Sequence, residues 1–341
     1  MDQFNTHLYE QVWTDLNFRL DRIGVDQGLG AALLALRDHQ LETGFITDDL
    51  SEVERIRLPN RRGNRSYYAQ YNPARARRFS GSGVTEPPPG AAKVNDGCFL
   101  CPENIQWQQF GREVGYDLQF DDREYVAWMN PYPLAPSHTV IAARNHIPQY
   151  WGATPHHLAH MVHDLLDLAH FLPGWIGFYN GEGAGASIPH HLHYQFFPRP
   201  PDYGRFPLER AVWSFGGDSL LDPVLVGRYP LDFAYWKGTH EDVVRRALPW
   251  IAAWARKARI DPDATANVIV INQDDGEGLQ LFFVPRDRRR ARSKRMTGIV
   301  GGLEVLGEIV CSSEDERRRL ASKELNYKTV KDILSDVSVG L

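Results

Sequence analysis

The 341-residue sequence predicts an α+β protein in which helices flank an antiparallel sheet and the chain forms two related halves. Short strand-like runs bounded by turn residues occupy positions 116–143, and more follow up to residue 197. A helical pattern interrupts these strands, and the same alternation of helix and strand returns between 241 and 336. The chain is too long for one minimal domain, which agrees with two halves.

The N-terminal region differs in composition from the rest. Residues 1 to about 58 are expected to be mostly helical, because Leu29, Leu33 and Leu36 recur at helical spacing. A stretch rich in Ser, Gly and Pro follows at 80–92 and is typical of a loop or linker. We therefore expect three regions: helices and linker at 1–92, one half of the α+β fold at 93–210, and the other half at 211–341.

Turn residues and hydrophobic periodicity predict where the remaining helices and strands lie. Pro155 suits the first turn of a helix that is expected to run to about Phe171. Further helices are expected near 241–258 and 313–336, the second of them strongly charged. Strands are expected at 125–129, 139–143, 175–179, 191–197, 267–272 and 279–284.

Composition narrows the class of protein. Hydrophobic residues make up 43% and charged residues 24%, as in an ordinary soluble globular protein. The formal net charge of −5 argues against a general nucleic-acid binder. No apolar run reaches the roughly 18 residues that a membrane span requires, and the N-terminus does not resemble a signal peptide. The chain contains three cysteines, a low and odd number that argues against a disulfide framework. A reducing, cytoplasmic compartment is therefore expected.

The segment around residue 193 carries the strongest chemical signal. On a strand, successive side chains alternate faces, so His191, His193 and Gln195 are expected on one face with apolar residues on the other. The preceding loop, 180–187, consists mainly of small residues that let backbone N–H groups approach an anion, and Ser187 adds a hydroxyl donor. The alternative interpretation is that these are ordinary surface or core histidines.

A phosphate bound beside such a strand could react with it. A neutral imidazole at His193 can attack phosphorus and form a covalent intermediate. Its other nitrogen then needs an acceptor, for which a carbonyl of the glycine-rich segment is expected. Gln195 can donate to a phosphoryl oxygen without taking a proton, which favours transfer between phosphates over hydrolysis.

This pattern resembles the histidine-triad superfamily. The match is to the branch of galactose-1-phosphate uridylyltransferase and of the dinucleoside-polyphosphate and nucleoside-diphosphate-sugar phosphorylases, where Gln replaces the last His. Residues 130–148, beginning Asn-Pro and ending Asn-His-Ile-Pro, are similar to further segments of that branch. So are residues 98–104, Cys-Phe-Leu-Cys-Pro-Glu-Asn, and the preceding Gln-Tyr-Asn-Pro at 70–73. The matching segments occur in the same order as in the family and lie between about residues 70 and 200.

The resemblance implies a histidine-triad-like fold and roles for particular residues. His193 would be the nucleophile and Gln195 would contact the transferred phosphoryl group. The 93–210 half would be catalytic, and the 211–341 half would complete the substrate site. The residues implied in substrate binding are Asn130, Asn180, Gly185 and Ser187. Arg78, just after the matching Gln-Tyr-Asn-Pro, is a further candidate for the substrate, with a solvated loop as the alternative.

A zinc site is also expected. Cys98 and Cys101 have the spacing of a half-site for tetrahedral zinc, although a redox pair or two reduced buried cysteines are alternatives. The resemblance implies that His146 and His191 complete a structural site, with His191 facing the metal and His193 the substrate.

Two weaker signals have simpler interpretations. The histidines at 156, 157, 160 and 163 have helical spacing and are expected on an exposed face rather than on a metal. The basic run at 286–295 could capture a phosphate-rich substrate, but a solvated loop is slightly favoured. Gly301 and Gly302 are expected in a turn.

The leading functional hypothesis is a nucleotidyltransferase or phosphorylase that acts on a small nucleotide or nucleotide sugar, with no nucleic-acid or membrane partner. The alternatives are a histidine-triad hydrolase, with water as acceptor, and a zinc-stabilised binding protein without catalysis. The sequence leaves the base, the sugar and the acceptor open. A homodimer is an expectation from the resemblance alone.

Overall fold

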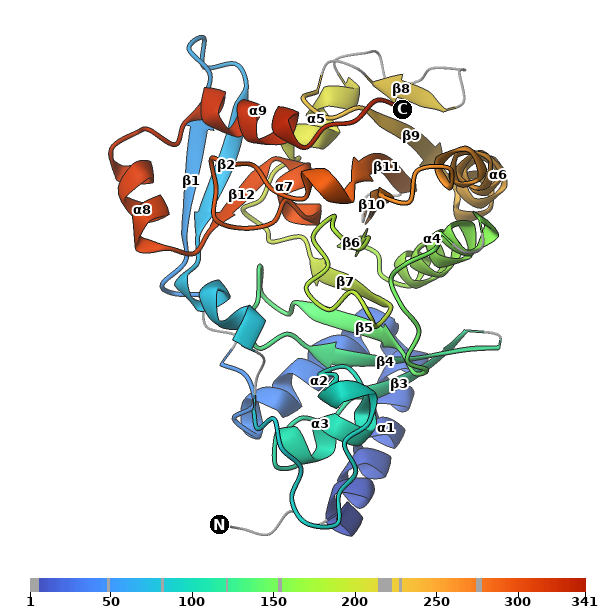
Figure 1. Ribbon diagram of the computed structural model, residues 1–341. Coiled ribbons are helices and arrows are strands. Elements are labelled where there is room, and N and C mark those ends of the chain that lie inside the picture. Colours follow the sequence, from blue (N-terminus) through green and yellow to red (C-terminus); the bar gives the residue numbers. More distant parts are fainter. Residues whose placement is uncertain are drawn as a thin grey trace.

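The computed structural model describes residues 6–47, 50–80, 83–120, 122–152, 155–213, 223–226, 229–273 and 278–341. Its centre is an antiparallel sheet of nine strands in the order β3-β4-β5-β7-β6-β10-β11-β9-β8 (Figure 1). The strands are β3 (Tyr116–Phe120), β4 (Arg123–Met129), β5 (Thr139–Ala143), β6 (Trp175–Asn180), β7 (His193–Pro198), β8 (Val224–Val226), β9 (Phe233–Gly238), β10 (Ala264–Asn272) and β11 (Leu279–Asp287).

The sheet consists of two halves with the same topology. In the first half the spatial order is β4-β5-β7-β6, and helix α4 (Pro155–His170) lies between β5 and β6 in the chain. In the second half the order is β8-β9-β11-β10, and α6 (His240–Ala258) lies between β9 and β10. The halves join where β6 pairs antiparallel with β10. The predicted α+β fold with an antiparallel sheet, flanking helices and related halves is therefore confirmed.

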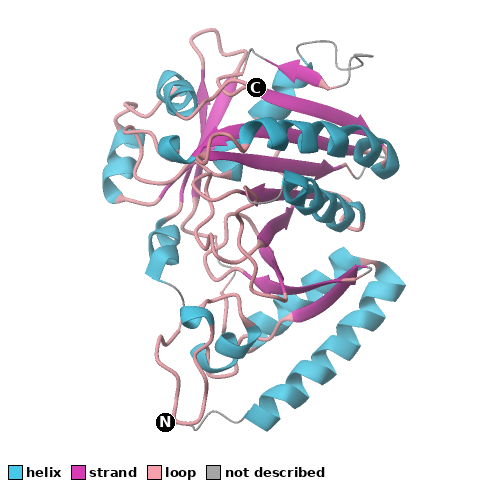
Figure 2. Cartoon of the chain, turned by 45° about the vertical axis from the view of Figure 1, so that its right-hand side comes forward, coloured by secondary structure: helices cyan, strands magenta, loops and turns pink. Residues whose placement is uncertain are grey.

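Helices cover one face of the sheet and mixed structure covers the other. Helices α4 and α6 pack side by side on the first face, as Figure 2 shows, and α1 (Thr6–Gln27) and α2 (Leu29–Glu42) extend that layer over β3 and β4. The opposite face packs against α5 (Pro207–Trp213), α7 (Gly302–Leu306), α9 (Tyr327–Asp336) and a small second sheet. Tyr194 and Phe196 of β7 enter the first core, so His193 and Gln195 point to the opposite side.

The small second sheet was not predicted. Residues 54–71 form a hairpin of β1 (Glu54–Pro59) and β2 (Ser66–Tyr71), whereas helix had been expected to about residue 58. On its other side β2 pairs in parallel with β12 (Glu308–Cys311), so the N-terminal region joins the C-terminal half. A partner strand so distant in sequence leaves no local pattern from which the pairing could be predicted.

Two boundaries also differ from the sequence-based expectation. The charged helix expected at 313–336 is two helices, α8 (Glu314–Ala321) and α9. The break contains Lys323 at a positive φ of 62°, and the Asn326 side chain caps α9 by accepting from Lys328 N and Thr329 N. Strand β7 begins at His193, so His191 lies in the segment before it. No helix in the described ranges is long and apolar enough to span a membrane.

Candidate functional site

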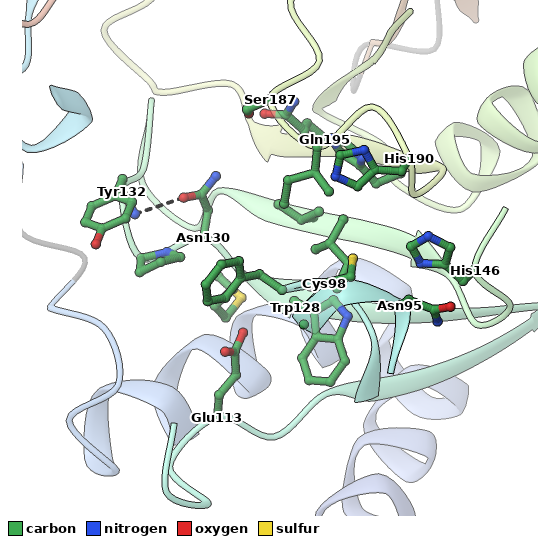
Figure 3. A pocket seen from close by; sticks show the side chains of 18 of the residues that line it. Asn95, Cys98, Glu113, Trp128, Asn130, Tyr132, His146, Ser187, His190 and Gln195 are labelled. Atoms are coloured by element: carbon green, nitrogen blue, oxygen red, sulfur yellow. Dashed lines mark hydrogen bonds between the residues drawn. The ribbon is translucent and has the colours of Figure 1, made fainter. Parts of the chain in front are cut away.

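A cavity of about 630 Å³ opens beside the ends of β4, β5 and β7 (Figure 3). Its lining includes Arg75 of the 3-10 helix that follows β2, the cysteine segment 95–100, residues 128–132 at the end of β4 and the loop before β7. A smaller cavity of about 30 Å³ adjoins it and shares three of its lining residues, Arg75, Ser187 and Gln195. The predicted catalytic and substrate-binding residues that line one or both cavities are Asn130, Asn180, Gly185, Ser187, His193 and Gln195, and the predicted metal ligands Cys98 and His146 also line the large one.

The ring of His193 is held in one tautomer. Its Nδ1 lies 2.8 Å from the backbone oxygen of His191, which can only accept a hydrogen bond, so Nδ1 carries the proton. Burial lowers the pKa of His193 to about 4, which keeps the ring neutral. The sequence had led us to expect an acceptor in the glycine-rich segment, and the acceptor is instead the backbone oxygen of His191. A neutral imidazole with Nδ1 protonated presents the Nε2 lone pair, the form that can attack an electrophile.

Gln149 joins the two segments that flank this ring. Its Oε1 accepts from His193 N at 3.0 Å, and its Nε2 donates to Asn180 O at 2.8 Å and to His193 O at 3.2 Å. The side chain is fully buried. It fixes the start of β7 against the end of β6, and sequence reasoning did not find it because a lone Gln in a loop carries no pattern.

The amide of Gln195 has a defined orientation. Leu134 N donates to His138 Nδ1 at 3.2 Å, so His138 carries its proton on Nε2. That Nε2 lies 3.0 Å from Gln195 Oε1 and therefore donates to it. Burial lowers the pKa of His138 to about 3, with Arg75 acting in the same direction, so the ring stays neutral. The Gln195 Nε2 donors are consequently left for a ligand.

A buried chain of side chains orients Asn180 in the same way. Arg286 Nη1 donates to Asn267 Oδ1 at 2.5 Å, and Asn267 Nδ2 donates to Asn180 Oδ1 at 2.7 Å. The Asn180 amide nitrogen thus remains as a donor for the smaller cavity that Asn180 lines. Arg286 is 1% exposed, and its charge lies behind a site lined by amide groups. A buried cation favours an anion in that cavity, and the Glu304 carboxylate, which lines the same cavity, offsets part of its charge.

Two glycine segments meet at the smaller cavity. Gly185 has a φ of +108°, and a Cβ atom there would lie 2.4 Å from Cα of Gly301. Gly301 was expected only in a turn, yet it lines this cavity with Gly302. The close approach requires glycine and lets backbone groups of both segments reach a ligand.

The 3-10 helix that follows β2 (Pro73–Ser80) brings an arginine to both cavities. Arg75 lines both cavities and is 8% exposed, with Nη1 donating to Tyr132 O at 2.6 Å. The Arg78 side chain, the further candidate for the substrate, lies outside the part of the chain that the structure describes. Asn130 lines the large cavity, and its Oδ1 accepts from Tyr132 N at 2.8 Å (Figure 3).

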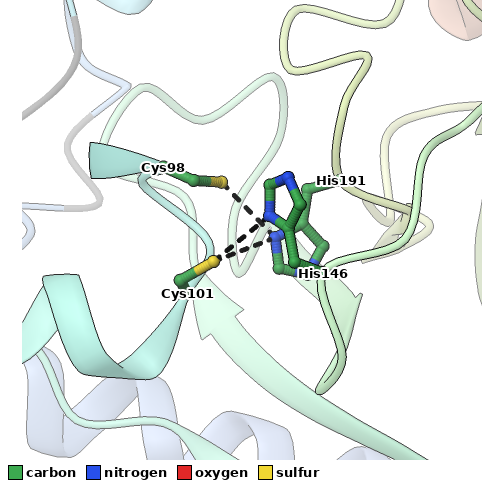
Figure 4. A group of neighbouring side chains, drawn as sticks. All are labelled: Cys98, Cys101, His146 and His191. Carbon is green, nitrogen blue, oxygen red and sulfur yellow. Dashed lines mark hydrogen bonds between the residues drawn. The ribbon is translucent and has the colours of Figure 1, made fainter. Parts of the chain in front are cut away.

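Four residues form a cluster that could hold a metal ion: Cys98, Cys101, His146 and His191 (Figure 4). Their ligand atoms all lie within 4.8 Å of one another. The Sγ-to-Nδ1 distances are 3.4 Å for Cys98 and His191, 3.6 Å for Cys101 and His191, and 3.3 Å for Cys101 and His146. Tetrahedral zinc, with bonds of about 2.3 Å to sulfur and about 2.0 Å to nitrogen, requires separations of roughly 3.3 to 3.8 Å.

The surroundings of the cluster support metal binding. His191 Nε2 lies 2.6 Å from the backbone oxygen of Ala143, which fixes the proton on Nε2 and leaves Nδ1 for a metal. Asn104 pins the cysteine loop, because its Nδ2 donates to Cys98 O at 3.0 Å and to Val94 O at 2.8 Å. The donor set and its hydrogen bonds fit a tetrahedral metal site.

The weaker sequence signals do not join the site. Three arginines of the basic run, Arg288, Arg289 and Arg295, are paired with carboxylates. Arg286 differs from them because it is buried and donates to Asn267 behind the smaller cavity. On α4, His163 faces Asp167, as does His240 from α6, whereas the His156 side chain is outside the described part.

Comparison with known proteins supports the fold. A family described as a domain of unknown function, DUF4922, matches residues 40–198. No curated protein matches the sequence. The structure of yeast Ap4A phosphorylase Apa2 in complex with Ap4A is similar, with 15% identity and a TM-score of 0.58 over 90% of this chain and 96% of that chain. Another structure of Apa2 gives 17% identity and a TM-score of 0.57 over 89% and 97%. The expected histidine-triad-like fold is confirmed.

Proposed function

We propose that this protein is a nucleotidyl-transferring phosphorylase that uses His193 as its nucleophile. The donor is a nucleoside-diphosphate sugar or a dinucleoside polyphosphate, and the acceptor is phosphate or a phosphorylated molecule. The observation that carries the proposal is the hydrogen bond from His193 Nδ1 to His191 O, which leaves a neutral Nε2 in a cavity lined by amide donors.

The reaction follows from these groups. His193 Nε2 attacks the α-phosphorus of the donor, and the bond to the bridging oxygen breaks, so that its electron pair leaves on the departing phosphate. An oxygen of the incoming phosphate then attacks the same phosphorus, and the phosphorus–nitrogen bond returns its pair to Nε2. Both leaving and attacking groups are already anionic, so no general acid is required.

The other residues stabilise charge. Gln195 Nε2, Asn180 Nδ2 and the Ser187 hydroxyl are donors around the two cavities, and they would contact the non-bridging oxygens. Neither Gln195 nor Asn180 titrates, which suits a reaction that moves a phosphoryl centre without proton transfer. Asn130 would lie near the nucleoside.

The domain roles follow the topology. The 93–210 half supplies the nucleophile, most of the large cavity and the metal cluster. The 211–341 half supports it through Asn267 and Arg286 behind Asn180, and through Gly301 beside Gly185. Strand β11, the counterpart of β7, contains no histidine, so the chain has one such centre among its described strands.

We further propose that Cys98, Cys101, His146 and His191 hold a structural zinc ion. Zinc bound by four protein ligands has no open position for a substrate, so its contribution is to join the cysteine loop to the segment before β7. The nucleophile follows His191 by two residues, and the metal would thus keep the His191 carbonyl in place for His193 Nδ1.

Relatives by fold support a nucleotide substrate. Yeast Apa2 is named an Ap4A phosphorylase, and its structures include complexes with Ap4A and with AMP. The fold, a cavity of nucleotide size and a neutral histidine agree with a phosphorylase of this general kind.

The test is to trap the intermediate. The protein is incubated without acceptor with labelled nucleoside-diphosphate sugars and dinucleoside polyphosphates, and mass spectrometry locates a nucleoside monophosphate on His193. H193G is expected to abolish the adduct, whereas H190G, which changes a neighbouring cavity residue, should retain it. Adding phosphate should release the label as a nucleoside diphosphate from the sugar donor. If no donor labels the wild-type protein, the proposal is wrong.

A further inference from the structure

The large cavity contains a buried carboxyl group that the proposed reaction does not use. Glu113 lines the cavity and is 6% exposed, and its carboxyl group points toward the interior in Figure 3. Among the described residues, no side chain or backbone group donates a hydrogen bond to that carboxyl group. Burial raises its pKa well above the ordinary value, because nothing nearby stabilises the charge.

The backbone that carries Glu113 is held firmly. Tyr9 of α1 donates to Glu113 O at 3.0 Å, and Gln40 of α2 donates to Val114 O at 2.9 Å. Asn17 of α1 donates to Gly115 O at 3.0 Å. Three side chains of the N-terminal helices therefore fix consecutive carbonyl groups. The carboxyl group enters the cavity from a rigid segment, so its position is set by the fold.

The order of groups along the cavity matches the order of groups in a nucleotide. In Figure 3, Ser187 and Gln195 lie at one end, Asn130 lies in the middle, and Glu113 lies at the other end beside Trp128. The first end offers donors for a phosphate. Trp128 beside Glu113 offers an apolar surface that suits the flat face of a base, and the cavity has further apolar lining at Phe99, Leu100 and Val140.

We propose that Glu113 recognises the base of the donor nucleotide and that this base is guanine; the inference rests on the proposed function. An ionised carboxylate only accepts hydrogen bonds, through two oxygens. Guanine presents two adjacent donors, N1–H and the N2 amino group, on its pairing edge. Adenine and cytosine present one donor beside an acceptor, and uracil presents one donor between two acceptors. Guanine alone satisfies both oxygens of the ionised carboxylate and offsets the charge that burial disfavours. A protonated carboxyl group would instead match adenine or cytosine, so tighter binding of AMP or CMP than of GMP would overturn the guanine assignment.

Binding of nucleoside monophosphates tests this without requiring catalysis. Calorimetry with GMP, AMP, CMP and UMP is expected to show that the wild-type protein binds GMP roughly 10- to 100-fold more tightly than the others. In E113Q the amide places a donor against guanine, so the GMP affinity should fall by a similar factor while AMP affinity is kept. E103Q, which changes an exposed carboxyl group on α3, should behave like the wild type.

The outcomes separate this inference from the proposed function. Equal affinity of the wild type for GMP and AMP overturns the guanine assignment, even if donors label His193. A GMP preference that survives in E113Q overturns the role of Glu113. A GMP preference lost in E113Q supports the inference even if no adduct forms on His193, in which case only the proposed reaction fails. If E113Q does not fold, the preference of the wild type alone decides the base.

Discussion

His138 Nε2 donates a hydrogen bond to Gln195 Oε1 at 3.0 Å, from the residue that precedes β5 to the middle of β7. The donor role is fixed because His138 Nδ1 already accepts from Leu134 N. Gln195 can then present only its two N–H groups to a ligand. His138 does not belong to the histidines of residues 190–193, yet it decides which side of the Gln195 amide a phosphoryl group would meet.

Replacing His138 should therefore lower the rate of transfer more than the affinity for the donor. In H138F the Gln195 amide is free to rotate, and we expect the rate of adduct formation on His193 to fall on the order of 10-fold or more. H138Q can still accept from Leu134 N and donate to Gln195, so it should recover part of the rate. Single-turnover labelling measures the rate and calorimetry the affinity. Equal rates for H138F and H138Q would contradict this role.

The orientation of Asn180 depends on Asn267 and can be reversed. In N267D the carboxylate still pairs with Arg286 but can no longer donate to Asn180 Oδ1. Asn180 should then rotate and turn its oxygen toward the smaller cavity, which repels a phosphate. We expect the affinity for a nucleoside monophosphate to fall about 10-fold. Because Asn267 Nδ2 also donates to Ala184 O at 2.6 Å, the thermal midpoint should fall as well, and affinity is therefore measured well below it.

The same strand supplies the control. Asn272 also lies on β10, and its Nδ2 donates to Ala169 O at 2.8 Å, at the end of the strand away from Asn180. N272D should leave nucleotide affinity unchanged. If N267D binds the nucleotide as tightly as N272D does, Asn267 has no part in orienting the site.

Sequence patterns predicted the parts of this molecule that depend on neighbouring residues. The alternation of helix and strand predicted both halves, and the spacing of Cys98 and Cys101, together with a family resemblance, predicted a cluster that the structure assembles. His138, Asn267 and Arg286 act through partners on other strands, and those pairings cannot be inferred from local spacing. Arg286 was also concealed within a run of exposed arginines. Glu113 could not be identified from the sequence, because its candidate role depends on its burial in the cavity.

Removal of the metal ligands should reduce stability and metal content together. The purified protein is expected to contain about one zinc ion per chain, and C101S should contain almost none. Because binding to a structural site contributes directly to folding free energy, the thermal midpoint of C101S should drop by about 10 °C. C311S alters another buried cysteine, on β12, and should keep its zinc. If the purified wild-type protein contains no metal and has the same thermal midpoint as C101S, the cluster is not a zinc site but two reduced cysteines beside two histidines.

The buried ion pair between Arg55 and Glu308 should make stability fall as pH rises. The two side chains are 2.8 Å apart, from Nε to Oε2, and Glu308 is fully buried. Burial raises the pKa of Glu308 despite the opposing effects of Arg55 and Tyr203, so the charged form is disfavoured on balance. A carboxyl group whose pKa is higher in the folded than in the unfolded protein stabilises the fold below the unfolded pKa. That contribution is lost as pH rises through the folded pKa.

The variant E308Q keeps the shape and an acceptor for Arg55 but does not titrate. We expect its free energy of unfolding, relative to that of the wild type, to increase between pH 4.5 and pH 7.5, as measured by urea denaturation at both values. E54Q is the control: Glu54 lies on β1 of the same small sheet, is exposed and pairs with Arg317 of α8, so this variant should show little change. If the ion pair were instead a net source of stability, E308Q would lose stability relative to the wild type as pH rises, the opposite trend.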